Sequence, residues 1–216
     1  MKKIFLNRSL SVLIPVVFFV LTSCVAQNEE LSLKSKDNLN EINLSLTKDG
    51  KLLYKVSRKD KTIIEDSPLG LVFENQDFSS GLSVAKVSAI EEKREQYELI
   101  VANNKVIDHV FKSKSITFKN SKDALMTIDL IAGQEGVAFR YKFPEQENQT
   151  RILKNELTGF HIAQNAKGWL QPYNKAGDYT PGYEDFYINV KPGDPINGAR
   201  GESVGWCMPA LFNVNN

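Results

Sequence analysis

The chain has 216 residues, of which 42% are hydrophobic and 25% charged, and its formal net charge is +1. This balance excludes a strongly basic nucleic-acid-binding protein, because phosphate recognition needs a basic face. The two cysteines, Cys24 and Cys207, are too few for a zinc site built on pairs of cysteines.

The first predicted element is a secretory signal over residues 1–23. An apolar run from Leu10 to Leu21 follows three cations, Lys2, Lys3 and Arg8. A short charged region, an apolar core and small residues before the cut are typical of such a signal. The run is also shorter than the roughly 20 apolar residues that a membrane-spanning helix needs. We therefore expect the segment to be removed, which lowers the formal charge from +1 to −2.

The signal ends in Leu21-Thr22-Ser23-Cys24, which resembles the bacterial lipobox. This resemblance implies cleavage before Cys24 and lipidation of its thiol. We therefore expect a lipid-anchored protein of the bacterial cell envelope, on the periplasmic or the outer-membrane face. Residues 24–38 show almost no apolar periodicity, which predicts a polar tether between the lipid and the folded domain.

Residues 39–216 are predicted to form one all-β domain. Ile42, Leu44 and Leu46 alternate with polar residues, and a turn containing Asp49-Gly50 separates them from a second alternating run. Asp-Gly between two such runs is a strong hairpin signal. Further strands are expected at residues 63–64, 69–73, 84–87, 97–101, 106–111, 115–118, 125–131 and 137–143. Residues 91–96 are expected to form a charged loop or one turn of helix. Many short strands with turns between them favour an antiparallel sandwich.

From about Thr158 onward the chain changes in character. Aromatic residues crowd into a stretch rich in Gly, Pro, Asn and Asp: Trp169, Tyr173, Tyr179, Tyr183, Phe186, Tyr187 and Trp206. Such residues form either a binding rim or a packed corner of the sandwich, because aromatics dominate interfaces and cores alike. Residues 210–214 resemble the start of a strand, yet the chain stops at Asn216. We therefore expect a truncated reading frame or the edge of a contig.

Few residues carry an obvious chemistry. His109 lies on the polar phase of a predicted strand, which indicates a solvated side chain, and His161 could face a cleft. Acidic residues gather near the aromatics: Glu156, Asp178, Glu184 and Asp185. Hard oxygen ligands on loops suit calcium. Charged loop residues are also commonly just solvated, so the residues alone leave both interpretations open.

Four segments together resemble the N-terminal domain of glycoside hydrolase family 97: residues 67–73, 136–144, 169–172 and 178–187. The resemblance runs in order from about Ile42 to Phe212. It implies a β-super-sandwich that precedes a (β/α)₈ catalytic barrel and a small C-terminal β-sandwich. It also implies an exo-acting α-glucosidase or α-galactosidase that removes terminal α-linked sugars from oligosaccharides.

The resemblance implies an active-site calcium ion, to which the N-terminal domain lends one glutamate. Glu184 is the match to that glutamate, with Glu156 as a second candidate. Trp169, Tyr173 and Tyr183 are candidates for one wall of the substrate pocket. Hydrolysis needs two carboxyl groups flanking the scissile bond, and both would belong to the absent barrel. We therefore expect no catalytic residue in this chain.

Three functions remain open on the sequence. The first is the N-terminal part of a calcium-dependent α-glycosidase, inactive without its barrel. The second is a stand-alone glycan-binding envelope lipoprotein, whose exposed aromatics stack on sugar rings. The third is a purely structural envelope domain. An open reading frame encoding a barrel after Asn216 would favour the first, and a natural stop would favour the second.

Overall fold

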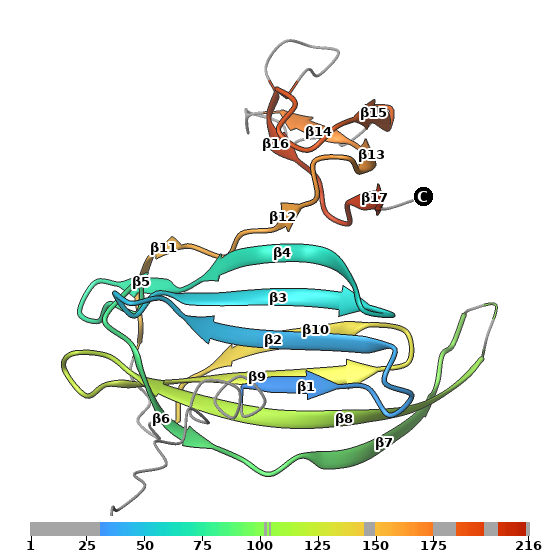
Figure 1. Ribbon diagram of the computed structural model, residues 1–216. Coiled ribbons are helices and arrows are strands. Elements are labelled where there is room, and N and C mark those ends of the chain that lie inside the picture. The colour runs from blue at the N-terminus through green and yellow to red at the C-terminus, as the bar shows by residue number, and fades with distance from the viewer. Residues whose placement is uncertain are drawn as a thin grey trace, which may run out of the picture.

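The computed structural model describes residues 31–101, 103, 105–144, 150–174, 185–196 and 203–214. These residues form antiparallel strands, with no helix among them (Figure 1). The part of the chain that is described therefore contains no helix with the length and apolar content of a membrane span. The predicted all-β, antiparallel fold is confirmed.

Two five-stranded sheets make up most of the fold. The first sheet has the order β1-β2-β3-β4-β12, with these bounds: β1 Ser32–Lys34, β2 Asn40–Leu46, β3 Leu52–Arg58, β4 Lys61–Leu69 and β12 His161–Ile162. The second sheet has the order β10-β9-β8-β6, and β7 also pairs with β8. Its bounds are β6 Ser83–Val87, β7 Glu91–Glu98, β8 Val106–Lys119, β9 Leu125–Gly133 and β10 Val137–Lys142.

Three small sheets complete the described structure. β5 (Leu71–Phe73) pairs with β11 (Leu153–Glu156) beside the sandwich. The chain then forms a three-stranded sheet of β15 (Ile188–Val190), β13 (Lys167–Leu170) and β17 (Leu211–Asn213), and a pair of β14 (Pro172–Asn174) and β16 (Ser203–Trp206). These last two sheets lie beyond β4 and β12, on the first-sheet side of the sandwich (Figure 1).

The hydrophobic core lies between the two main sheets. The first sheet contributes Leu33, Ile42, Leu44, Leu52, Tyr54 and Leu69, and the second contributes Ile116, Phe118, Met126, Ile128 and Leu130. Successive side chains of a strand point to opposite faces, so the strands that contribute to this core alternate a core residue with an outward one. The alternation predicted for residues 42–46 and 125–131 is confirmed by the complete burial of Ile42, Leu44, Ile128 and Leu130.

The predicted turn between β2 and β3 is also confirmed. Gly50 has a φ of 72°, in the left-handed region that glycine adopts without steric cost. Its amide donates to the carbonyl of Thr47 (2.9 Å), and the Thr47 amide donates to the carbonyl of Lys51 (3.0 Å). The turn is packed against the segment before β6, because the amides of Gly81 and Leu82 donate to the carbonyls of Asp49 and Gly50.

The folded domain begins earlier than the expected boundary at residue 39. β1 lies within the predicted polar tether, pairs with β2, and buries Leu33 completely. Leu31, just before β1, is buried as well. Two alternating leucines, Leu31 and Leu33, are too few to predict a strand from periodicity. The strand is identified only by its pairing with β2.

Residues 91–96 are a strand, contrary to the expected loop or helical turn. β7 pairs with β8 from Glu91↔Ser113 to Glu98↔Val106, although each of its residues is exposed. The expected strand over residues 97–101 correspondingly ends at Glu98, and the two strands expected at 106–111 and 115–118 are one continuous β8. A strand with neither face buried has no apolar alternation, so its backbone pairing alone defines it.

A buried asparagine joins the two main sheets. The Asn40 amide group donates to the carbonyls of Gly133 (2.8 Å) and Gln134 (2.9 Å), in the turn between β9 and β10. Its carbonyl oxygen accepts from Nη1 of Arg58 (2.7 Å). All three bonds satisfy polar atoms that would otherwise be costly to bury. Asn40 therefore fixes the β9–β10 turn against the first sheet.

Candidate functional site

The C-terminal aromatic region predicted from sequence is built on β13 to β17. Trp169 lies in β13, opposite Asn189 of β15 and Leu211 of β17. Side chains of Trp169, Leu211, Phe212 and Val214, with Ile63 of β4, line an apolar hollow of about 420 Å³. Leu211 is 63% exposed and Trp169 is 36% exposed. Exposed apolar patches of this kind commonly mark interaction surfaces, so this apolar hollow is a candidate docking surface.

Tyr173 has a different environment from Trp169. It lies in β14 opposite Gly205 of β16, and a Cβ atom added at Gly205 would lie 2.3 Å from Cε1 of the Tyr173 ring. Gly205 is therefore required for the close packing of this tyrosine, which points to a structural role for the ring. Tyr183, Glu184 and Cys24, the remaining candidates from sequence, lie outside the described residues.

Glu156, the second calcium candidate, belongs to a chain of hydrogen bonds at the edge of the sandwich. Its Oε1 accepts from the Thr158 hydroxyl (2.8 Å), and that hydroxyl is 2.8 Å from the hydroxyl of Tyr141. The Tyr141 oxygen also accepts from the amide of Gly70 (3.0 Å). Burial raises the pKa of Tyr141, so its hydroxyl keeps its proton as a donor. Glu156 is exposed, and this arrangement gives it a hydrogen-bonding role at the edge of the sandwich.

No cluster of three or more His, Cys, Asp or Glu side chains that could hold a metal occurs within the described ranges. Calcium takes six to eight oxygen ligands, so Glu156 and its described neighbours do not form such a site. His109 is partly exposed, with Nδ1 3.6 Å from Oε2 of Glu135, and His161 Nδ1 is 2.7 Å from the carbonyl oxygen of Asp66. Neither histidine has the surroundings of a metal ligand in the described structure.

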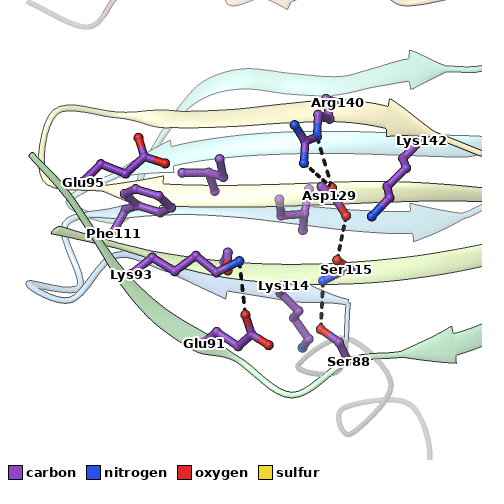
Figure 2. Close-up of a pocket in the computed structure, with 13 residues that line it drawn as sticks. Ser88, Glu91, Lys93, Glu95, Phe111, Lys114, Ser115, Asp129, Arg140 and Lys142 are labelled. Carbon is purple, nitrogen blue, oxygen red and sulfur yellow. Dashed lines mark hydrogen bonds and ion pairs between the residues drawn. The ribbon is translucent and has the colours of Figure 1, made fainter. Parts of the chain in front are cut away.

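Sequence reasoning missed a second hollow, on the outer face of the second sheet. We call it the outer hollow, and its volume is about 290 Å³ (Figure 2). Side chains from β7, β8, β9 and β10 line it, together with Ser88 from the segment between β6 and β7: Glu91, Lys93, Glu95, Phe111, Ser113, Ser115, Asp129, Ile131, Arg140 and Lys142. Asp129 stands between Ile128 and Leu130, which are fully buried, so its side chain points away from the core.

A row of hydrogen bonds fixes the polar groups of the outer hollow (Figure 2). Oγ of Ser115 donates to Oδ1 of Asp129 (2.6 Å), while Nε and Nη2 of Arg140 donate to Oδ2 of the same carboxylate (3.1 and 3.0 Å). The Ser115 amide in turn donates to Oγ of Ser88 (2.9 Å). These hydrogen bonds fix four residues, from three strands and one loop, relative to one another.

The carboxylate of Asp129 is ionised in this setting. Burial by itself would raise its pKa, but the hydrogen bonds from Ser115 and Arg140 and the nearby charge of Lys142 outweigh burial and lower the pKa. A general acid in glycoside hydrolysis needs the opposite shift, toward a raised pKa. Asp129 is therefore suited to binding polar groups and unsuited to act as a general acid. In the sequence, the only indication of the outer hollow was the set of polar residues that alternate with apolar ones in β9 and β10. Alternation predicts that these residues face solvent, but it does not predict that they line a hollow.

Comparison with known proteins identifies a family that this chain matches. Residues 33–216 match the family model described as the N-terminal domain of glycosyl hydrolase 97. A probable retaining alpha-galactosidase of Streptomyces bingchenggensis (strain BCW-1) is 28% identical over 128 residues, which are 58% of this chain and 19% of that protein.

Solved structures show the same fold. A glycoside hydrolase family 97 enzyme from Pseudoalteromonas sp. strain K8, in complex with panose, superposes with a TM-score of 0.69 at 22% identity. The match covers 85% of this chain and 26% of that enzyme. A beta-arabinopyranosidase superposes with a TM-score of 0.77 at 23% identity, over 86% of this chain and 30% of that one. The chain thus spans less than a third of the length of each of these relatives.

Proposed function

Since the chain belongs to glycoside hydrolase family 97 through its N-terminal domain, we propose that it is the sandwich part of an exo-acting α-glucosidase or α-galactosidase. The observation that carries the proposal is the family match over residues 33–216, which includes both main sheets and the small sheets of the aromatic region. The relatives are glycosidases several times as long as the matched part. In this proposal the catalytic carboxylates belong to a barrel, and this domain supports that barrel.

The apolar hollow formed by Ile63, Trp169, Leu211, Phe212 and Val214 is the proposed contact with the barrel. Burying its exposed side chains would contribute about 25 cal/mol for each Å² of apolar surface removed from water. Phe186 and Tyr187 follow the undescribed residues 175–184 and are also largely exposed. We propose a substrate-wall role for Trp169 and Tyr183 and a calcium-ligand role for Glu184; the last two lie outside the described residues.

A second candidate function is a glycan-binding envelope lipoprotein that acts without a barrel. The observation that favours it is the exposure of Phe186 (88%) and Tyr187 (57%), since aromatic faces can stack on sugar rings. The two functions differ in what the exposed aromatics contact: a protein domain in the first and a sugar in the second.

Activity measurements test the first function. The purified 216-residue chain should not cleave p-nitrophenyl α-glucoside or α-galactoside, because the acid and base of the reaction are absent from it. The same chain continued into a family 97 barrel and C-terminal domain should release p-nitrophenol from one of the two. A variant of the longer protein with Leu211→Ser alone, which keeps the proposed substrate-wall residue Trp169, should lose activity through weakened domain contact. Turnover by the 216-residue chain alone would refute the assignment.

Membrane anchoring is a separate proposal, motivated by Leu21-Thr22-Ser23-Cys24. Expressed in a bacterial host with its signal, the protein should partition into the detergent phase, because the acyl chains add apolar surface. Cys24→Ser should move it to the aqueous phase, as measured by phase separation and immunoblotting. Full retention of the Cys24→Ser protein in the detergent phase would mean that the apolar run itself anchors the chain.

A further inference from the structure

The outer hollow is separate from the region assigned to the barrel contact. Its residues lie on the face of the second sheet that points away from the core. The aromatic strands β13 to β17 lie beyond β4 and β12, past one edge of the first sheet (Figure 1). A ligand bound in the outer hollow would therefore leave the apolar hollow accessible. The proposed barrel contact does not use any residue of the outer hollow.

Hydrogen bonds hold four polar residues of the outer hollow, Ser88, Ser115, Asp129 and Arg140, in place before any ligand arrives. Asp129 has a side chain only 15% exposed, whereas the Arg140 side chain that binds it is 74% exposed. Asp129 thus orients a guanidinium group whose remaining N–H donors are open to a ligand. On the β7 side, Nζ of Lys93 is 3.1 Å from Oε2 of Glu91. Groups fixed in this way lose little conformational entropy when they bind.

The charges of the outer hollow are nearly balanced. Three cations, Lys93, Arg140 and Lys142, face three anions, Glu91, Glu95 and Asp129. Lys114 is a fourth cation of the lining, and its Nζ donates to the carbonyl of Ser32 in β1 (3.3 Å). A ligand of high charge of either sign would therefore meet repelling as well as attracting groups. A neutral ligand with several hydroxyl groups matches this surface, because each hydroxyl can both donate and accept.

The floor of the outer hollow is apolar at one point. Phe111 is buried but stands apart from the main core, on the outward phase of β8, and Ile131 of β9 is partly exposed beside Ser113. An apolar floor surrounded by fixed polar groups suits a ring that has C–H groups on its face and hydroxyls at its rim. A volume near the lower end of the usual range for ligand pockets, roughly 300 Å³, limits the ligand to a small one.

We propose that the outer hollow is a non-catalytic binding site for a neutral sugar, with Arg140 and Asp129 contacting adjacent hydroxyls and Ile131 contacting the ring. The choice of sugar as the ligand class rests on the proposed function. The location rests on the described geometry alone. The site would hold a glycan chain at the domain while its terminal residue is processed elsewhere.

The test is a titration of the 15N-labelled full chain with panose, followed by amide NMR shifts. Saturable shifts are expected at Ser113, Ser115, Ile131 and Arg140, the residues that line the outer hollow. Arg140→Gln should weaken binding about tenfold, the effect of losing one charged hydrogen bond. Ser113→Trp should abolish binding by filling the hollow, and it leaves the Asp129–Arg140 pair intact. The melting temperature of each variant confirms that it is folded.

Arg94→Gln is the matched control, because Arg94 stands next to Lys93 on β7 but faces the other side, where it binds Asp108 through Nε (2.7 Å). Its panose affinity should equal that of the unchanged chain. Shifts confined to Trp169, Tyr173 and Phe186, or no saturable shifts, would overturn the proposal. Tighter binding of inorganic phosphate than of panose in the outer hollow would contradict the proposal that the ligand is neutral. None of these outcomes depends on hydrolysis, so the proposed glycosidase function is tested separately.

Discussion

Gly50→Ala is expected to lower the free energy of unfolding by about 3 kcal/mol, as the sum of backbone strain and overpacking. Gly50 has a φ of 72°, which a Cβ atom disfavours. The added Cβ would also lie 2.6 Å from the backbone nitrogen of Leu82 and 2.9 Å from the backbone carbon of Gly81. Backbone atoms cannot rotate away as a flexible side chain can, so the β2–β3 turn and the segment before β6 must separate. Urea unfolding, monitored by tryptophan fluorescence, measures the change.

Gly136→Ala is the matched control in the turn between β9 and β10. An added Cβ at Gly136 meets no atom within 4 Å, and its φ is not positive. The substitution should therefore leave the free energy of unfolding within about 1 kcal/mol of its original value. Equal losses at Gly50 and Gly136 would show that the contact with Gly81 and Leu82 is not the cause.

Glu184→Gln, made in the longer protein that includes the barrel, is expected to weaken calcium binding about tenfold or more. The motivating observation is an acidic residue in an aromatic, Gly- and Pro-rich stretch, matched by resemblance to the family's calcium glutamate. Loss of a residue that only hydrogen-bonds to a metal ligand lowers metal affinity about 10- to 100-fold. Loss of a direct ligand should lower the affinity at least as much. Glutamine keeps the shape and removes the charge. Calorimetry with calcium, together with α-glycoside hydrolysis, measures both consequences.

Glu156→Gln is the comparison for that experiment. Its carboxylate accepts from Thr158 at the edge of the sandwich, so calcium affinity should stay unchanged. The 216-residue chain alone should bind calcium weakly or not at all, because one carboxylate is far short of a full coordination shell. Unchanged calcium affinity and turnover in Glu184→Gln would refute the assignment of Glu184. A loss in Glu156→Gln alone would transfer the role to Glu156.

The sequence by itself determined the strands that bury one face, and the turns between them. Ile42 and Leu44 alternate with polar residues in β2, and Asp49-Gly50 marks the turn to β3. These features are local: alternation follows from the two faces of a strand, and a positive φ favours glycine. The resemblance to family 97 also came from the sequence, and the family match over residues 33–216 confirms it.

Only the tertiary structure decided the elements whose stability comes from distant partners. β7 is charged along both faces and is a strand because β8 pairs with it. Leu33 in β1 and Leu31 just before it become core residues only against β2 and the second sheet. The outer hollow joins Ser88, Ser115, Asp129 and Arg140 across three strands and a loop. Alternation places these residues on the outer face, but the register between strands decides which of them meet, because each contact joins residues far apart along the chain.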